Sequence, residues 1–177
     1  MDVIVAVVLS VLAILLLVGL MALGWRNRLR RQGPLAEPVG SPANPGVPLY
    51  AAEGQYVVTT TAGDWLDRIT VHGLGVKAVA TAAVYDHGLL FDRTAGPDTY
   101  IPGVDLRRVR VERGMAGKFV EKDGLVVVTW ELDGTLLDTG FRTRYAAEAA
   151  PLLAALGTLI QQRDPSDPAD PTTKESQ

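Results

Sequence analysis

Cysteine is absent from the 177 residues of this chain, and histidine occurs only twice. Disulfides, thiolate nucleophiles and cysteine-ligated metals are therefore excluded, and a zinc site would need carboxylate ligands. A surplus of positive charge is also missing, since 17 Lys and Arg stand against 20 Asp and Glu for a net charge of −3. A general nucleic-acid binder is not expected, because such proteins concentrate basic charge. No G-x-S-x-G or H-E-x-x-H motif occurs, so we expect no enzymatic activity, cofactor or metal.

Aromatic residues make up only 6% of the chain, yet its mean hydropathy is positive at +0.16. The excess lies in one segment, because Val3 to Leu23 contains a single serine and no charged residue. As a helix, this run would span roughly 30 Å, which is the thickness of one hydrocarbon core. Residues 1–25 are therefore predicted to form a transmembrane anchor, with Trp25 at the depth of the lipid headgroups.

Positive charge follows the apolar run directly, at Arg26, Arg28, Arg30 and Arg31. Clustered arginines remain on the cytoplasmic side of a membrane, so we expect the N-terminus outside and the rest of the chain in the cytoplasm. A cleaved signal peptide is the alternative, with cleavage at Ala22-Leu23-Gly24. It fits less well, because a signal peptide carries its positive charge before a short apolar core.

Three segments follow the anchor. Residues 26–48 contain the basic juxtamembrane segment and then prolines at 34, 38, 42, 45 and 48, so a semi-extended linker is expected over residues 33–48. Residues 163–177 repeat Asp-Pro and lack large apolar side chains, which predicts a disordered tail. The remaining residues, 49–162, are long enough for one folded domain.

This domain is predicted to be mainly β. The segment 124–132 alternates so that Val126, Val128, Trp130 and Leu132 share one face. Asp133-Gly134 indicates a tight hairpin before a return strand over 135–141. Other strands are expected at 55–61, 68–72, 88–92, 100–101 and 104–112. Trp65 and Trp130 are expected in the core.

One amphipathic helix is expected at the end of the domain. Thr143 could cap it, and apolar residues from Tyr145 to Ile160 recur at helical spacing. Pro151 lies inside this pattern and is expected to kink or break the helix.

A dinucleotide-binding enzyme is an alternative interpretation of residues 69–93. Gly73-x-Gly75-x-x-Ala78 follows a predicted strand, and Asp92 could bind a ribose. We disfavour this interpretation, because the crossover would be short and hairpins rather than further βα units follow. Gly73 and Gly75 would then shape a turn between strands.

Arginines recur along one predicted strand and form the best candidate binding patch. The patch consists of Arg107, Arg108, Arg110, Arg113 and Lys118. Val109 and Val111 would point inward, which places Arg108 and Arg110 on the solvent face, where they could hold a carboxylate or phosphate. The alternative is a solvated strand whose arginines pair with nearby acids, namely Asp105, Glu112 and Glu121.

A run of strands ended by one helix resembles the pleckstrin-homology-like (PH-like) barrel. More narrowly, the chain resembles actinobacterial single-pass membrane proteins that have a PH-like cytoplasmic domain. Besides the anchor, the resembling segments are Tyr56-Val-Val-Thr-Thr60, Asp64-Trp-Leu-Asp-Arg68, Glu112-Arg-Gly-Met-Ala-Gly-Lys118 and Asp138-Thr-Gly-Phe-Arg142. The resemblance implies a barrel or sandwich of about seven antiparallel strands closed by a C-terminal α-helix.

The resemblance also implies a function. Genes of these proteins neighbour pyrimidine-biosynthesis genes, and some members are labelled transporters or export proteins. We expect a non-enzymatic module that recruits cytosolic proteins to the inner membrane, and the gene neighbourhood of the family implies partners from the pyrimidine pathway. An accessory subunit of a transport or export system is the alternative. Phosphoinositide-binding PH domains carry basic residues in their first hairpin, whereas residues 61–67 here are acidic, so inositol-lipid binding is not implied.

Overall fold

The computed structural model describes residues 2–32, 35–112, 114–115, 118–119 and 124–163. The chain divides into two compact units, Met1–Leu35 and Ala36–Gln177. The sequence predicts a disordered tail over 163–177. Its first residue, Arg163, ends a helix instead, and residues 164–177 lie outside the described residues.

The first unit contains helix α1, Asp2–Gln32, which extends well beyond the apolar run. Its longest stretch of described side chains covers residues 7–21, and all of them are exposed. In the described part of the chain, no helix is long and apolar enough to cross a membrane. This finding does not support the transmembrane anchor expected over 1–25. The side chains of the expected interface residues, Trp25, Arg26, Arg28, Arg30 and Arg31, lie outside the described residues.

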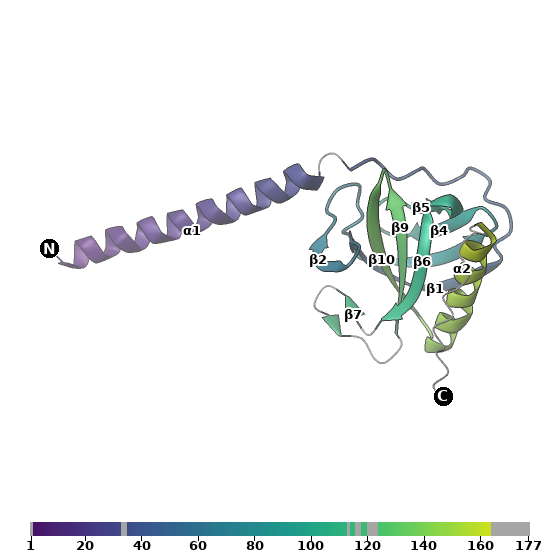
Figure 1. Ribbon diagram of the computed structural model, residues 1–177. Helices are drawn as coiled ribbons and strands as arrows, with labels where there is room; N and C mark the ends of the chain where they lie inside the picture. The colour runs from purple at the N-terminus through teal and green to yellow at the C-terminus, as the bar shows by residue number, and fades with distance from the viewer. Residues whose placement is uncertain (1, 33–34, 113, 116–117, 120–123, 164–177) are drawn as a thin grey trace, which may run out of the picture. The chain divides into compact units, whose positions relative to one another are not determined.

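The second unit is built on one antiparallel sheet of eight strands (Figure 1). Seven strands follow the order β5-β4-β3-β1-β10-β9-β6, and β2 pairs with β1. Their bounds are β1 Tyr50–Thr61, β2 Asp64–Arg68, β3 Ala78–Tyr85, β4 Gly88–Arg93, β5 Thr99–Pro102, β6 Leu106–Glu112, β9 Leu125–Leu132 and β10 Thr135–Thr143. A separate ribbon joins β7, Gly114–Met115, to β8, Lys118–Phe119. Short 3₁₀ helices cover Gly103–Asp105 and Ala146–Glu148.

The sheet curves around its core, as contacts between distant strands show. Phe91 on β4 and Phe141 on β10 are three strands apart in the sheet, yet their ring centroids lie 5.6 Å apart. On a flat sheet, three strand spacings would separate them by about 14 Å. Tyr56 packs edge-on against Phe91 at 5.5 Å. The expected mainly β domain is therefore confirmed, with eight strands in the sheet and a C-terminal helix.

The hairpin β9–β10 forms as its sequence predicts. Asp133 and Gly134 both have positive φ, at 48° and 77°, which matches the two-residue turn that suits the twist of paired strands. Trp130 is fully buried, as expected. It donates from Nε1 to Thr139 Oγ1 at 2.9 Å, so its one polar group is satisfied inside the core.

The connection between β1 and β3 differs from its prediction. The strand expected at 68–72 is wrong, because β2 ends at Arg68 and residues 71–75 form turns. His72 lies in these turns with a φ of 53°. Trp65 is 48% exposed rather than in the core, because it lies on the short strand β2, which pairs with β1 only at Thr60 and Thr61.

Helix α2, Ala149–Arg163, starts later than expected. Thr143 is the last residue of β10 rather than a helix cap. Pro151 lies in the first turn, where its missing N–H would have no partner within the helix, so it does not break the helix. Leu152, Leu156 and Leu159 are buried along the sheet-facing side.

Gly54 is a position where the curved sheet leaves no space for a side chain. A Cβ there would meet the backbone carbonyl of Arg142 and would lie 2.8 Å from the ring of Phe141. We expect Gly54→Ala to lower the free energy of unfolding by about 2 kcal/mol, measured by urea unfolding of the full chain. Gly157→Ala on α2 is the control, because its Cβ would meet nothing within 4 Å. Equal stability of the two variants would contradict this packing.

Candidate interaction surface

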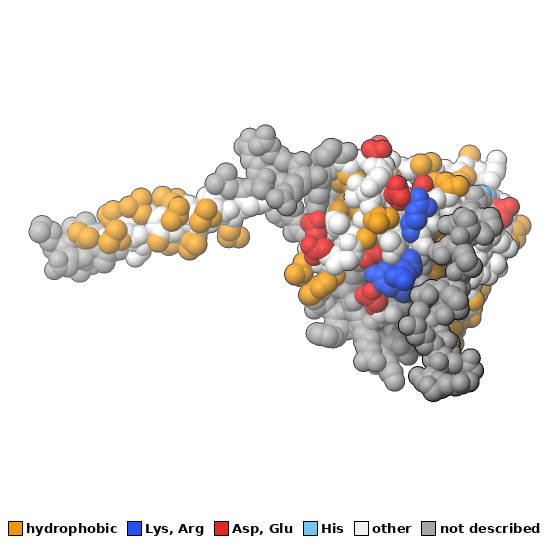
Figure 2. All heavy atoms as spheres, viewed as in Figure 1, with side chains coloured by type: hydrophobic (Ala, Val, Ile, Leu, Met, Phe, Trp, Pro, Cys, Tyr) orange, Lys and Arg blue, Asp and Glu red, His pale blue; other side chains and the backbone are white. Residues whose placement is uncertain are grey.

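Strand β6 carries three of the predicted patch arginines on one face. A register shift between Leu106 and Arg108 lets two successive residues, Arg107 and Arg108, face outward. Arg110 follows two residues later on the same face, while Val109 pairs with Val128 on the core face. Figure 2 shows basic side chains on the face with β6 and β9, with acidic side chains close to them.

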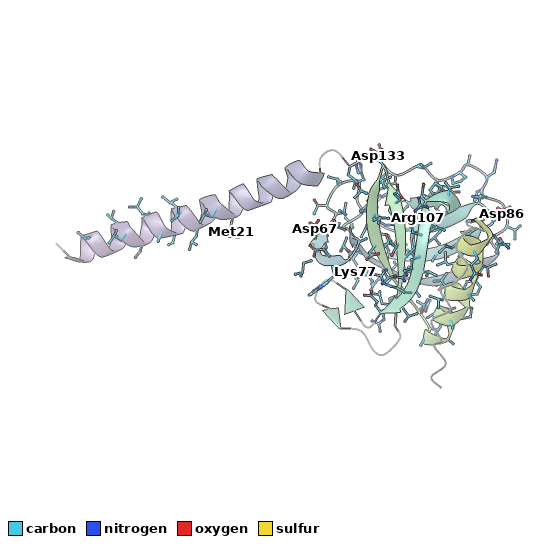
Figure 3. The ribbon with its side chains drawn as sticks, in the orientation of Figure 1. Met21, Asp67, Lys77, Asp86, Arg107 and Asp133 are labelled. Carbon is cyan, nitrogen blue, oxygen red and sulfur yellow. The ribbon has the colours of Figure 1, made fainter. Side chains whose placement is uncertain are left out.

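Arg107 is engaged in a local ion pair. Its Nη2 and Nε lie 2.9 and 3.2 Å from Glu131 Oε2 on β9. Its Nη1 donates to the carbonyl of Val104 at 2.6 Å. Figure 3 labels Arg107 where β6 runs beside β9. The guanidinium of Arg107 is therefore already paired within this chain, although the side chain remains partly exposed to solvent.

Arg110 belongs to a buried network. Its Nη1 and Nη2 donate to the two oxygens of Asp138 at 3.1 and 2.8 Å, and its Nε donates to Glu112 at 2.6 Å. Asp138 is 5% exposed as a side chain, whereas Arg110 is 30% exposed. Thr129 donates to Asp138 Oδ1 at 2.6 Å, and the backbone N–H of Gly63 donates to Oδ2 at 3.1 Å. The bidentate pair fixes β6 to β10 across β9.

The network shifts the pKa of both charged partners. Burial alone would raise the pKa of Asp138, but the hydrogen bonds from Arg110, Thr129 and Gly63 bring it below its ordinary value. The hydrogen bond to Asp138 raises the pKa of Arg110. The pair therefore stays ionised at neutral pH.

Arg108 differs from its two neighbours. Its side chain is exposed, and to residues 35–112 and 124–163 that side chain makes no hydrogen bond or ion pair. Its strand is fixed by the pairing of β6 with β9. Toward the described residues, Arg108 therefore presents an unpaired guanidinium on a hydrogen-bonded strand. Arg113 and the side chain of Lys118, the other two predicted patch residues, lie outside the described residues.

The turn at β2 adds acidic and apolar groups to the surface. Asp64 Oδ1 accepts hydrogen bonds from the N–H groups of Leu66 and Asp67, at 3.1 and 3.3 Å. Asp67 Oδ2 accepts from Thr61 Oγ1 at 2.7 Å, and Figure 3 shows Asp67 beside β2. Trp65 and Leu66 are exposed between these carboxylates. Residues 61–67 contain these two carboxylates and no basic side chain.

The glycine motif at 73–78 has a structural role. Ala78 begins strand β3, which pairs antiparallel with β4, whereas a dinucleotide unit needs a helix there and a parallel strand. Arg93 Nη2 donates to the carbonyls of Gly73 and Val76, both at 2.9 Å. The structure does not support the nucleotide-binding alternative. As the favoured interpretation expected, these glycines lie in a turn between strands, and Arg93 anchors it.

Sequence reasoning missed the network around Asp138. The available signal was a carboxylate inside the strand 135–143, since a charge in a half-buried strand needs a partner. The partner, Arg110, lies 28 residues away. Within the described ranges, no three His, Asp or Glu side chains gather in a way that could hold a metal ion.

The family of this chain follows from a match that covers most of the folded domain. The sequence profile described as "Bacterial PH domain-like" matches residues 35–157. The chain belongs to this family. The PH-like domain thus includes the sheet, most of α2 and the linker from Leu35. No curated protein matches the chain.

Solved structures that are similar to this PH-like protein share little sequence with it. A chain of "The 8S snRNP Assembly Intermediate" has 11% identity and a TM-score of 0.46, with 78% of this chain and 97% of that chain covered. Vav1 inhibited by an allosteric inhibitor has 15% identity and a TM-score of 0.39, with 66% of this chain and 27% of that chain covered. The C-terminal domain of an unknown protein from Leishmania infantum has 14% identity and a TM-score of 0.36, with 77% of this chain and 97% of that chain covered.

Proposed function

We propose that this protein is a non-enzymatic interaction module, held at the inner membrane by its N-terminal helix, that recruits cytosolic proteins through its PH-like domain. The observation that carries the proposal is the family match over 35–157, placed shortly after the uncharged run Val3 to Leu23. PH-like domains generally mediate protein or lipid interactions. A protein partner is favoured, because Asp64 and Asp67 would repel anionic lipid from the β2 turn.

Arg108 is the contact that we propose for the partner. Its guanidinium is exposed on a paired strand, next to Arg107 and Arg110, which already hold carboxylates of this chain. A carboxylate of a partner could therefore bind Arg108 without breaking an ion pair to any residue that the structure describes. Charge-assisted contacts of arginine are among the stronger polar contacts at interfaces.

Membrane attachment and orientation are tested with reporters on the full chain. We expect the chain in the membrane fraction, resistant to carbonate extraction, with a fluorescent C-terminal fusion active and an alkaline phosphatase fusion inactive. The control variant replaces Arg26, Arg28, Arg30 and Arg31 by asparagine and should weaken this orientation bias. Recovery of the chain outside the membrane fraction, or an active phosphatase fusion, would contradict the proposal.

Arg108→Glu should leave the fold intact. We expect the free energy of unfolding to change by no more than about 0.5 kcal/mol, because Arg108 is exposed and unpaired among the described residues. Urea unfolding of the full chain measures this effect. Arg110→Glu is unsuitable for a binding test, since it would place a second carboxylate against the buried Asp138. A large loss of stability in Arg108→Glu would show that Arg108 has a structural role.

A further inference from the structure

One outer face of the sheet is covered although it lies away from the core. On β3, β4 and β5, the residues Ala83, Leu90 and Tyr100 are direct partners across the strands and so share a face. They are 6 to 7% exposed, as is Tyr85. The opposite face carries core residues such as Val84, Leu89 and Ile101. Both sides of this part of the sheet are therefore shielded from water.

The linker reaches this outer face. His87, in the turn between β3 and β4, has its Nε2 3.0 Å from the carbonyl oxygen of Pro45. Figure 3 labels the neighbouring Asp86 in the same turn. The N–H of Leu49 then bonds the carbonyl of Val84 at 2.8 Å and leads the chain into β1. The linker is therefore in contact with the domain rather than a free spacer.

The linker presents its prolines to the domain in a regular way. Pro38, Pro42 and Pro45 are half-buried, whereas the residues between them are exposed. A polyproline II segment has three residues per turn, so positions three or four apart return to one side. No helix or strand forms over residues 35–48. The burial pattern fits an extended segment that lies on the domain by one edge.

The groups facing this edge suit a proline-rich segment. The ring of His87 stacks on Tyr85, with centroids 5.4 Å apart and planes 7° apart, and the ring of Tyr100 lies 5.7 Å away. Because a carbonyl only accepts, Nε2 of His87 carries the proton given to Pro45. Nδ1 lies 2.6 Å from the Tyr100 hydroxyl, which holds the ring in place. Aromatic surfaces with a donor aimed at a backbone carbonyl recognise polyproline II segments.

We propose that Tyr85, His87 and Tyr100 form a binding site for proline-rich segments, and that residues 38–45 of the same chain occupy it. This aromatic site is separate from Arg108 and does not depend on the proposed membrane function. Its ligand class is a polyproline II peptide with an available carbonyl. The short connection to β1 gives the linker an effective concentration in the millimolar range, so a segment from another protein must compete with it.

The test uses the full chain, whose lack of cysteine allows a single spin label. Ser41→Cys places a nitroxide on the linker, and Gln161→Cys on α2 is the control site. The probe is a peptide with the sequence of residues 35–48, LAEPVGSPANPGVP, added at about 5 mM, within the expected effective concentration. The control peptide has alanine at its three positions that correspond to Pro38, Pro42 and Pro45. The variant His87→Phe retains an aromatic ring and removes the donor.

We expect the mobile fraction at position 41 to rise with the probe peptide and to stay constant with the alanine peptide. His87→Phe should raise that fraction about fivefold without peptide, the effect of losing one neutral hydrogen bond. The label at 161 should report no change, and far-UV circular dichroism should show that the variant is folded. The proposal is overturned if both peptides act alike, if His87→Phe leaves position 41 unchanged, or if the probe peptide releases no label.

Discussion

Replacing Asp138 by alanine is expected to lower the free energy of unfolding by about 3 kcal/mol. The carboxylate is 5% exposed and accepts four hydrogen bonds, two from Arg110 and one each from Thr129 and Gly63. Its removal leaves the half-buried Arg110 without its main partner and releases the Gly63 turn. Urea unfolding of the full chain measures the loss. Glu131→Ala is the matched control, because its ion pair with Arg107 is exposed and should contribute at most about 1 kcal/mol.

The carboxylate of Asp138 is also expected to make the free energy of unfolding depend on pH in the acidic range. The pKa of Asp138 is lowered in the folded state, so its contribution is complete above the unfolded value of about 3.9. It is lost as the pH falls below that value through the folded pKa. Asp138→Asn should therefore show a shallower loss of stability than the unmodified chain as the pH falls below about 4. Parallel acid profiles for the two proteins would argue against an ionised, hydrogen-bonded Asp138.

Arg93→Met is expected to cost about 3 kcal/mol although it conserves most of the side-chain volume. Arg93 is 6% exposed, and its guanidinium donates to the carbonyls of Gly73 and Val76 and to Thr99 Oγ1. Its Cζ lies 4.1 Å from the centre of the Tyr56 ring. Methionine cannot donate, so the carbonyls of Gly73 and Val76 would each lose a hydrogen bond, and the cation–π contact would be lost as well.

Urea unfolding would measure the loss of stability in Arg93→Met, and amide hydrogen exchange would show whether the turn at Gly73 opens. The N–H of Val76, which bonds the carbonyl of Gly73 at 3.1 Å, should exchange faster in the variant, because the turn is no longer anchored. The stability of Arg93→Lys should lie between those of the unmodified chain and Arg93→Met, since an ammonium group can reach some of the acceptors. A loss below about 1 kcal/mol in Arg93→Met would mean that the turn is held by its own backbone.

Short sequence patterns predicted those features of the fold that depend on residues close together in the sequence. Period-two alternation in β9 identified the buried Trp130, and Asp133-Gly134 identified the hairpin because both positions adopt positive φ. The mainly β class and the closing helix follow from the same signals. Pro151 was misjudged because the helix boundary depends on where β10 ends. One proline at helix position three is tolerated, whereas the same residue in the interior is not.

The candidate sites depend on contacts that no local pattern contains. The outward position of Arg107 follows from a shift in strand register, which changes the face of a residue without a sequence marker. The pairing of Arg110 with Asp138, and of His87 with Pro45, joins residues 28 and 42 positions apart. The exposure of Trp65 follows from the edge position of β2. Of the five predicted patch residues, Arg108 is the one that the described structure leaves available.

The measurement that tests the central claim most directly is quantitative co-purification with the full chain from solubilised membranes. Three proteins are compared: the unmodified chain, Arg108→Glu, and Arg142→Glu as an exposed arginine elsewhere on the domain. We expect cytosolic proteins with the unmodified chain and Arg142→Glu, and about tenfold less of them with Arg108→Glu. Equal recovery from all three, or recovery of multi-span membrane proteins alone, would contradict a recruiting module that acts through Arg108.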